Sequence, residues 1–379
     1  MAGPRKQKIA DLRSVGPGTP GGRFLRSFWQ PVYASDRLPA GRAVPLRILG
    51  EDFTLYRGES GTPYVVGPDC AHRGLALSVG RIEGECISCF YHGWTYDGTG
   101  RCVAQPAEKT AFCERATIPA YPTREYLGLI FVYFGEGAPP ELPELDVFAG
   151  EGIVENRVST RDWPFFAQLE NSVDEVHFNF THRQSKFSEV GLNDEIPEII
   201  GQETEYGIER IARRGNETRR CFILMPNCMY SLVYYKGKGY AEHLSWRVPV
   251  DDDTHTSFIA DLVHKSADEL EAYRAAQAEE KRRLETLEPA MLVIRRILAG
   301  ELHIDEVPER PDIVLIQDGV AMLGQRSRDR SKDLLGASDH LVALLRRIWT
   351  RELSAIEEGR PIKQWRIPRD LVPTKGLPE

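Results

Sequence analysis

The sequence predicts an α+β protein in which a small all-β domain precedes a larger domain of strands and helices. Short alternating apolar runs, separated by turn residues, fill the chain from about residue 24 to 135, as expected for half-buried strands. After residue 150 the apolar spacing becomes helical, and a second group of strands follows. The length of 379 residues also favours two domains, because one hydrophobic core seldom organises so long a chain.

The first domain is expected to follow an N-terminal arm over 1–23, which is polar and rich in glycine and proline. Its strands should include PVYAS, VPLRILG, FTLYRG, PYVVG and LGLIFVYFG. Residues 136–150, EGAPPELPELDVFAG, combine proline with acidic residues and are predicted to form a linker. The predicted boundaries are therefore 24–150 for the first domain with its linker, and 151–379 for the second.

The second domain should begin with a helical segment within 163–182, where Phe166, Leu169 and Val173 follow helical spacing. Strands are expected within 219–264, in CFILMPNCMYSLVYY, LSWRVPV and SFIADLV. Residues 266–299 should form one or two helices, and a last helix should cover 339–358 with Ser338 as its N-cap.

Composition narrows the function classes. A net charge of −8 and a pI near 5.7 argue against nucleic acid as the main partner. No apolar run approaches the roughly 20 residues that span a bilayer, and the start lacks the apolar segment of a secretory signal. We therefore expect a cytoplasmic protein with no membrane partner. Seven cysteines, an odd and small number, favour metal binding over a disulfide framework.

Residues 70–94, CAHRGLALSVGRIEGECISCFYHGW, contain the first candidate metal site. Two pairs, Cys70-x-His72 and Cys89-x2-His92, each combine one thiol and one imidazole on a short segment that ends in glycine. Two thiolates and two imidazoles match a [2Fe–2S] cluster in which histidines replace two cysteines on one iron. The pattern therefore predicts an electron-transfer centre.

Tetrahedral zinc is the competing hypothesis for this stretch. Cys86 and Cys89 form a C-x2-C pair that Cys70 and His72 could complete. That arrangement would leave His92 without a role, so we interpret Cys86 as a small buried residue that binds no metal.

The segments CAHRG and CFYHGW resemble the cluster motif of Rieske proteins, C-x-H followed by C-x2-H, including the neighbouring glycines and Trp94. The resemblance implies that residues 24–150 form a Rieske [2Fe–2S] domain. Its cluster ligands would be Cys70, His72, Cys89 and His92.

A second candidate site lies in LENSVDEVHFNFTHRQ, residues 169–184. On a helix, Glu170, Asp174 and His177 would fall within one narrow sector, with Asn171 beside them. His182 follows where the helix should loosen or end. Two imidazoles and a carboxylate that leave open positions on a metal are typical of non-haem Fe(II) oxygenases.

This stretch resembles the iron-binding helix of Rieske non-haem iron oxygenase α subunits of the phthalate-dioxygenase, dicamba- and vanillate-demethylase-like group. The resemblance implies that His177 and His182 bind one mononuclear Fe(II). It places the third ligand at Asp318, in VLIQDGVAMLGQ. Asp312, Asp329 and Asp333 are rivals, and Asp318 could instead favour a helix N-terminus electrostatically.

The family pattern also assigns roles to two neighbours. Asp174 matches a bridging aspartate that would bind both His177 and His92 of the next subunit, with Glu170 as second choice. Asn171 is expected near the substrate or the iron.

The resemblance implies an α+β fold whose catalytic domain has an antiparallel sheet flanked by helices, assembled as a homotrimer. Electrons would come from NAD(P)H through a reductase, a ferredoxin or both, and O₂ would hydroxylate a small aromatic substrate. We expect monooxygenation that leads to O- or N-dealkylation, with cis-dihydroxylation or ring hydroxylation of an aromatic acid as the alternative. A Rieske electron carrier without oxygenase chemistry is the alternative from another class. The residues expected to line the substrate pocket are Phe165, Phe166, Leu169, Val173, Phe180 and parts of CFILMPNCMYSLVYY.

Overall fold

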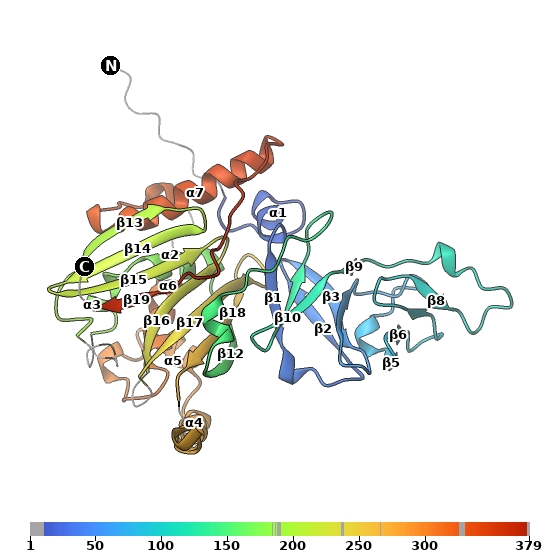
Figure 1. Ribbon diagram of the computed structural model, residues 1–379, viewed down its shortest axis with the longest axis horizontal. Coiled ribbons are helices and arrows are strands. Elements are labelled where there is room, and N and C mark those ends of the chain that lie inside the picture. Colours follow the sequence, from blue (N-terminus) through green and yellow to red (C-terminus); the bar gives the residue numbers. More distant parts are fainter. Residues whose placement is uncertain are drawn as a thin grey trace.

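The computed structural model describes residues 11–183, 185, 187, 191–235, 239–265, 267–325 and 330–376. Figure 1 shows a smaller lobe of short strands beside a larger lobe built on one broad sheet. This arrangement confirms the predicted α+β fold, with an all-β first half followed by a larger half of strands and helices. None of the helices in the described ranges has both the length and the apolar content needed to cross a bilayer.

Three small antiparallel sheets form the first lobe. The sheet nearest the large lobe has the order β1-β11-β10, with bounds Trp29–Ala34, Leu129–Tyr133 and Thr123–Tyr126. The middle sheet is β2-β3-β4-β9, with bounds Arg42–Ile48, Glu51–Arg57, Pro63–Val66 and Ala120–Tyr121. The sheet at the far tip is β5-β6-β7-β8, with bounds Arg81–Glu83, Cys86–Ser88, Thr95–Tyr96 and Cys102–Ala104.

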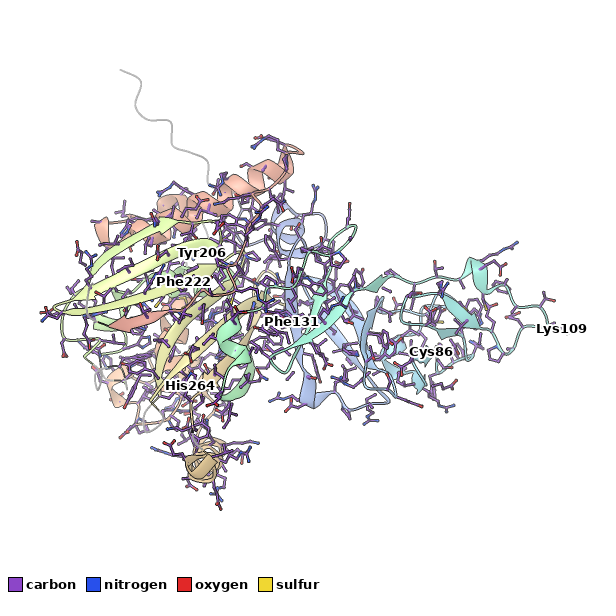
Figure 2. The ribbon with its side chains drawn as sticks, in the orientation of Figure 1. Cys86, Lys109, Phe131, Tyr206, Phe222 and His264 are labelled. Carbon is purple, nitrogen blue, oxygen red and sulfur yellow. The ribbon has the colours of Figure 1, made fainter. Side chains whose placement is uncertain are left out.

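The β1-β11-β10 sheet joins the two lobes. Every residue of β11 is buried, and the ring of Phe131 lies 5.4 Å from that of Trp246 in the large sheet. Figure 2 shows Phe131 between the lobes, with Cys86 in the small lobe and Phe222 in the large one. Asn227 donates a buried hydrogen bond to Gln30 at 2.9 Å. One hydrophobic core therefore continues across the junction between the lobes.

The large lobe is organised by an eight-stranded antiparallel sheet. Cross-strand partners share a face of such a sheet, and Ser231 faces His243 while Arg247 faces Ser257. Odd-numbered residues of β16, β17 and β18 therefore lie on one common face.

The strand order in this sheet is β12 (Ile153–Arg161), β18 (His255–Val263), β17 (Gly239–Pro249), β16 (Cys228–Tyr235), β15 (Glu217–Leu224), β14 (Gly207–Arg214) and β13 (Glu198–Glu203), with β19 (Thr374–Gly376) beside β15.

Helix α7 (His340–Glu357) lies along the top of the large lobe in Figure 1. Its apolar residues recur at three- and four-residue intervals and bury one face. Trp349 is fully buried, and its ring packs against one aromatic ring from each of two other helices, α1 (Pro20–Arg26) and α2 (Phe165–Val173). The ring centroids are 4.9 Å apart for Phe24 of α1 and 5.3 Å apart for Phe166 of α2. This contact clamps α2 between α7 and the sheet.

The remaining helices are α3 (His177–Phe180), α4 (Ala267–Thr286), α5 (Ala290–Leu298) and α6 (Ile313–Gly324). Helices α4 and α5 confirm the prediction of one or two helices in 266–299. Helix α4 projects at the bottom of Figure 1, where it is seen end-on.

Two local predictions were wrong. Glu170, Asp174 and His177 do not share one continuous helix, because α2 ends at Val173 and Asp174 is extended. The Asp174 carboxylate accepts the N–H of Val176 at 2.8 Å, a local bond that competes with helical hydrogen bonding. At the C-terminal helix, Asp339 rather than Ser338 is the N-cap residue.

The N-terminal segment is also less extended than expected. Helix α1 begins at Pro20, where Thr19 caps it by accepting the N–H of Gly22. Leu12 and Val15 are buried against the core. The described part of this arm is therefore packed onto the protein.

Candidate metal centres

Two loops at the tip of the small lobe, 70–75 and 89–94, share one backbone geometry. In each loop the cysteine N–H donates to the carbonyl of the last residue, at 2.9 and 2.8 Å. The glycine four residues after each cysteine donates back to the cysteine carbonyl, at 2.9 and 3.0 Å. Gly74 and Gly93 have φ of 72° and 71°, a conformation that other residues rarely adopt. The two segments predicted from the motif are thus structural equivalents.

These twin loops sort the four candidate ligands into like pairs. Cys70 and Cys89 are buried free thiols in contact with each other. The imidazoles of His72 and His92 lie 4.6 Å apart between ring centroids and are partly exposed. A [2Fe–2S] cluster with two thiolates on one iron and two imidazoles on the other fits this sorting. A zinc site would instead surround one atom with all its ligands.

Neighbouring groups suit a bound thiolate. Burial raises the pKa of the Cys89 thiol, and so does the contact with Cys70, while the backbone N–H groups of Tyr91 and His92 lower it. The Tyr96 hydroxyl lies 3.2 Å from the Cys70 sulfur. Hydrogen-bond donors around sulfur ligands orient them and tune the potential of a cluster.

Cys86, which the zinc hypothesis required, lies outside the twin loops. It begins β6 and pairs with Glu83 across the β5–β6 hairpin. Burial and nearby acids, including Asp97, raise the pKa of its thiol. Cys86 is half-buried rather than buried as predicted, and its interpretation as a residue that binds no metal stays a prediction.

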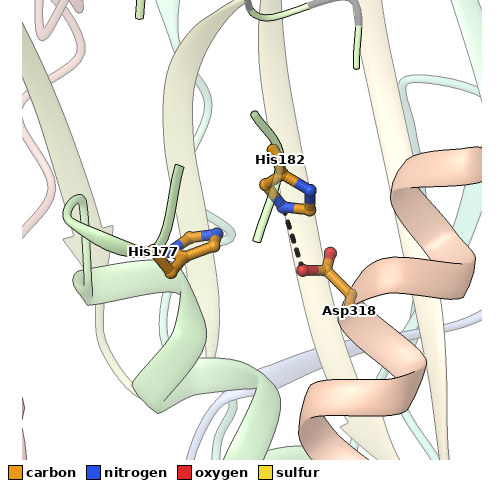
Figure 3. Close-up of side chains that lie close together, drawn as sticks. All are labelled: His177, His182 and Asp318. Carbon is orange, nitrogen blue, oxygen red and sulfur yellow. Dashed lines mark ion pairs between the residues drawn. The ribbon is translucent and has the colours of Figure 1, made fainter. Parts of the chain in front are cut away.

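In the large lobe, His177, His182 and Asp318 converge on one point (Figure 3). One potential ligand atom from each lies within 4.8 Å of the others, and His182 Nε2 is 3.2 Å from Asp318 Oδ1. His177 begins α3, His182 follows that helix, and Asp318 comes from α6. Residues from distant parts of the chain thus form one cluster.

Hydrogen bonds fix both imidazoles with the same nitrogen free. His177 Nδ1 donates to the carbonyl oxygen of Asp174 at 2.7 Å, and His182 Nδ1 donates to Gln317 Oε1 at 2.8 Å. Each ring therefore presents Nε2 to the centre of the cluster. Asn171 Nδ2 donates to Asp318 Oδ1 at 3.1 Å, which orients the carboxylate.

The protonation states also suit a metal. Burial lowers the pKa of His177, although nearby Asp318 acts in the opposite direction. Burial raises the pKa of the Asp318 carboxyl, but the proximity of His182 and His177 and the hydrogen bond from Asn171 outweigh burial and hold that pKa below its usual value. Neutral imidazoles and an ionised carboxylate are the forms that bind metal.

The rival acids are engaged elsewhere. Asp312 pairs with Arg310 at 2.5 Å, and Asp333 pairs with Arg346 at 2.7 Å. Asp329 lies outside the described residues.

Asp174 and Glu170 differ in what they can reach. The Asp174 carboxylate binds the backbone N–H of His177 at 3.4 Å, so within one chain its main-chain oxygen, not its carboxylate, contacts the imidazole. Glu170 is buried in ion pairs of 2.6 Å with both Arg330 and Arg346. These pairs tie α2 to the C-terminal part of the chain, so Glu170 is not available as a bridge.

His177, His182 and Asp318 line a cavity of about 360 Å³ between the helices and the sheet. Of the residues expected to line a pocket, Phe165, Phe166, Leu169 and Val173 belong to the core instead. Phe180 lines a separate cavity of about 550 Å³ that contains none of the three ligand residues. The stretch CFILMPNCMYSLVYY does contribute to the cavity through its odd-numbered residues Met229, Ser231, Val233 and Tyr235.

Sequence reasoning missed Gln317, the hydrogen-bond partner of His182, and two of the arginines that line the cavity, Arg161 and Arg247. The signal for Gln317 was its position beside Asp318. The arginines could have been found from strand alternation, which places them on the same face as the other cavity residues.

Comparisons with known proteins relate this chain to oxygenase subunits. The Rieske [2Fe-2S] domain family matches residues 28–122. The chain is 29% identical to the 5,5'-dehydrodivanillate O-demethylase oxygenase subunit of Sphingobium sp. (strain NBRC 103272 / SYK-6), over 97% of this chain and 84% of that protein. It is also 29% identical to the phenoxybenzoate dioxygenase subunit alpha of Ectopseudomonas oleovorans, over 92% and 85%. The crystal structure of dicamba monooxygenase bound to dicamba has the same fold, with a TM-score of 0.65 and 17% identity over 89% of this chain and 100% of that one.

Fold, sites and comparisons define an oxygenase that couples a Rieske [2Fe–2S] cluster to a mononuclear non-haem iron. The chain is a homologue of the terminal oxygenase, or α, subunits of these enzymes. When bound, the mononuclear iron supplies O₂ activation, and the cluster supplies the electrons that this chemistry needs.

Proposed function

We propose that this enzyme monooxygenates a small aromatic compound and thereby removes an O- or N-linked alkyl group. The supporting observation is the cluster of His177, His182 and Asp318 at the wall of a 360 Å³ cavity. That volume suits a small ligand. One relative is named as an O-demethylase, and a protein of the same fold as a monooxygenase.

In this proposal the three ligand residues hold Fe(II) and leave positions for O₂ on the cavity side. Asn171 keeps the Asp318 carboxylate in place. Apolar residues of the cavity wall, Phe178 and Phe187 among them, exclude water and hold the ring so that the alkyl carbon faces the iron.

Cys70, His72, Cys89 and His92 would hold the Rieske cluster. The cluster and the mononuclear site lie in different lobes, far from each other along the long axis in Figure 1. We therefore propose a head-to-tail homotrimer in which each tip meets the iron site of the next subunit, an interface that closes into a ring. Phe90 and Tyr91, beside His92, are 63% and 56% exposed in the single chain, as expected for a surface that docks.

Asp174 would complete this interface. Its main-chain oxygen already fixes His177, and the side chain is partly exposed. Its carboxylate could bind His92 of the neighbouring subunit and so link the two redox centres. A ferredoxin or a reductase would supply the electrons, and the cytoplasmic location stays a prediction.

Product analysis with ¹⁸O₂ tests the reaction. The purified protein, an NADH-dependent reductase and methoxybenzoates or N-methylanilines would be incubated together. Dealkylation converts a methyl ether, O₂, two electrons and two protons into a phenol, formaldehyde and water. We expect formaldehyde in equal amount to the phenol or amine formed. A diol carrying two ¹⁸O atoms would instead support the alternative, dihydroxylation of the ring. His177→Ala, which retains the cluster loops, is the control and should give neither product.

A further inference from the structure

Two arginines stand on the sheet side of the cavity. Arg161 is the last residue of β12, and Arg247 lies in β17. Both line the cavity that His177, His182 and Asp318 border. Arg161 pairs with His255 and Arg247 pairs with Ser257, both on β18, so the two arginines flank that strand on one face of the sheet. The charge of Arg161 lowers the pKa of Arg247, whereas nearby Asp318 raises the pKa of both arginines.

Neither arginine has a carboxylate partner within the described part of the chain. Arg247 is 8% exposed; it donates to the hydroxyl of Ser245, and its Nε has no hydrogen-bond partner. The Arg161 guanidinium lies over the Trp163 ring, 5.8 Å from its centroid. The other arginines that line the cavity are paired: Arg157 with Asp261, and Arg210 and Arg219 with Glu175.

An unpaired guanidinium in such a place destabilises the fold. Arg247 is buried and Arg161 is half-buried. Burial lowers the pKa of each group to about 10, and for Arg247 the proximity of Arg161 contributes to this lowering. Both groups nevertheless stay charged near neutral pH. Buried charges are normally paired, so an anion that enters the cavity would complete these two.

The rest of the cavity is consistent with an anionic aromatic ligand. Ser231 is 2% exposed and lines the cavity, and among the residues that the structure describes none is a hydrogen-bond partner for its hydroxyl. Among the acids that face the cavity, Asp318 belongs to the metal site and Asp312 is paired. Glu280, from α4, is the remaining one. Apolar side chains such as Ile259 and Leu315 leave room for a ring.

We propose that Arg161 and Arg247 bind the carboxylate of an aromatic carboxylic acid, with the Ser231 hydroxyl as a further donor. Guanidinium groups match the planar carboxylate with paired hydrogen bonds. The proposal rests on the proposed function, because the carboxylate at the sheet would direct the opposite end of the ring to the iron.

Binding to the iron-loaded protein under anaerobic conditions tests this separately from turnover. Calorimetry would compare benzoate and the three methoxybenzoates with their methyl esters. The variants are Arg161→Gln and Arg247→Met. The control is Arg295→Gln. Arg295 lies on α5 and forms an exposed ion pair with Asp162, so this variant also removes one positive charge, but away from the cavity. In wild type at least one acid should bind roughly 30-fold more tightly than its ester, as expected for charge-assisted hydrogen bonds.

Arg247→Met should reduce this preference at least tenfold, Arg161→Gln should weaken it, and Arg295→Gln should leave it unchanged. Arg247→Met should also unfold at the same or a higher temperature, because it removes an unpaired buried charge. The proposal is wrong if wild type does not prefer any acid over its ester, or if a folded Arg247→Met keeps the preference. Preferential binding without dealkylation would contradict the proposed reaction and leave the carboxylate site intact.

Discussion

The hydrogen bond from His182 to Gln317 offers a quantitative test of the mononuclear site. His182 is 1% exposed, and its Nδ1 donates to Gln317 Oε1 at 2.8 Å. In Gln317→Leu this acceptor is lost. Without metal, the ring can place its proton on Nε2 and donate to Asp318, 3.2 Å away. Metal binding requires Nε2 and forces the proton back to Nδ1, now beside a leucine.

The cost of the change should therefore appear in metal affinity. A buried donor left without its acceptor costs about 1–3 kcal/mol, and loss of such a supporting bond typically weakens metal binding about 10- to 100-fold. Competition with a chelator, followed under anaerobic conditions, would measure the Fe(II) affinity. The visible spectrum of the Rieske cluster is the internal control and should not change.

Gln317→Glu is the matched variant, because it keeps an acceptor of the same length. Its Fe(II) affinity should equal or exceed that of wild type. The reasoning is refuted if Gln317→Leu binds Fe(II) within twofold of wild type, or if both variants lose affinity equally, since packing alone would then explain the effect.

Three further predictions concern other buried groups. Glu175→Gln should lower the free energy of unfolding by about 3 kcal/mol, because Arg210, Arg214 and Arg219 surround this one carboxylate; a change below about 1 kcal/mol in urea unfolding would contradict this. Burial lowers the pKa of His255 from 6.5 to about 3. Below pH 6.5 the unfolded chain therefore binds a proton at this residue that the folded chain does not bind. As the pH is lowered below 6.5, the free energy of unfolding should decrease by about 1.4 kcal/mol per pH unit. His255→Gln should remove that slope between about pH 6 and 5, and an unchanged slope would assign it to other groups. Asp174→Asn should retain both metals yet slow product formation after reduction of the cluster; a wild-type single-turnover rate would exclude the bridge.

Local spacing was enough to predict the cluster loops. Within each loop the cysteine, the histidine and the glycine lie within four residues of one another, so turn geometry alone sets the shape of each loop. The convergence of His177 and His182 with Asp318 depends on the packing of α6 against the α2–α3 segment. Only the resemblance to known oxygenases singled out that aspartate.

Other errors have physical causes. The apolar residues keep helical spacing across 166–176, which predicted a helix that continues past Val173. The helix ends there because the Asp174 carboxylate accepts the backbone N–H of Val176 in place of a helical hydrogen bond. The aromatic residues of α2 looked like a pocket wall because apolar spacing alone does not tell which element covers them. Trp349, more than 180 residues downstream of Phe165, covers that face. Whether Arg161 and Arg247 have a carboxylate partner depends on residues that are distant in the sequence. A local sequence pattern therefore could not predict that they are unpaired.

The central claim is that one chain holds two separate iron centres. The most direct measurement is the iron and acid-labile sulfide content of wild type, Cys89→Ser and His177→Ala after reconstitution. The account predicts about three irons per wild-type chain, two in the cluster and one mononuclear. His177→Ala should lose only the mononuclear iron and keep the sulfide, whereas Cys89→Ser should lose the cluster iron and the sulfide. Zinc in the twin loops, or the loss of all iron in His177→Ala, would contradict it.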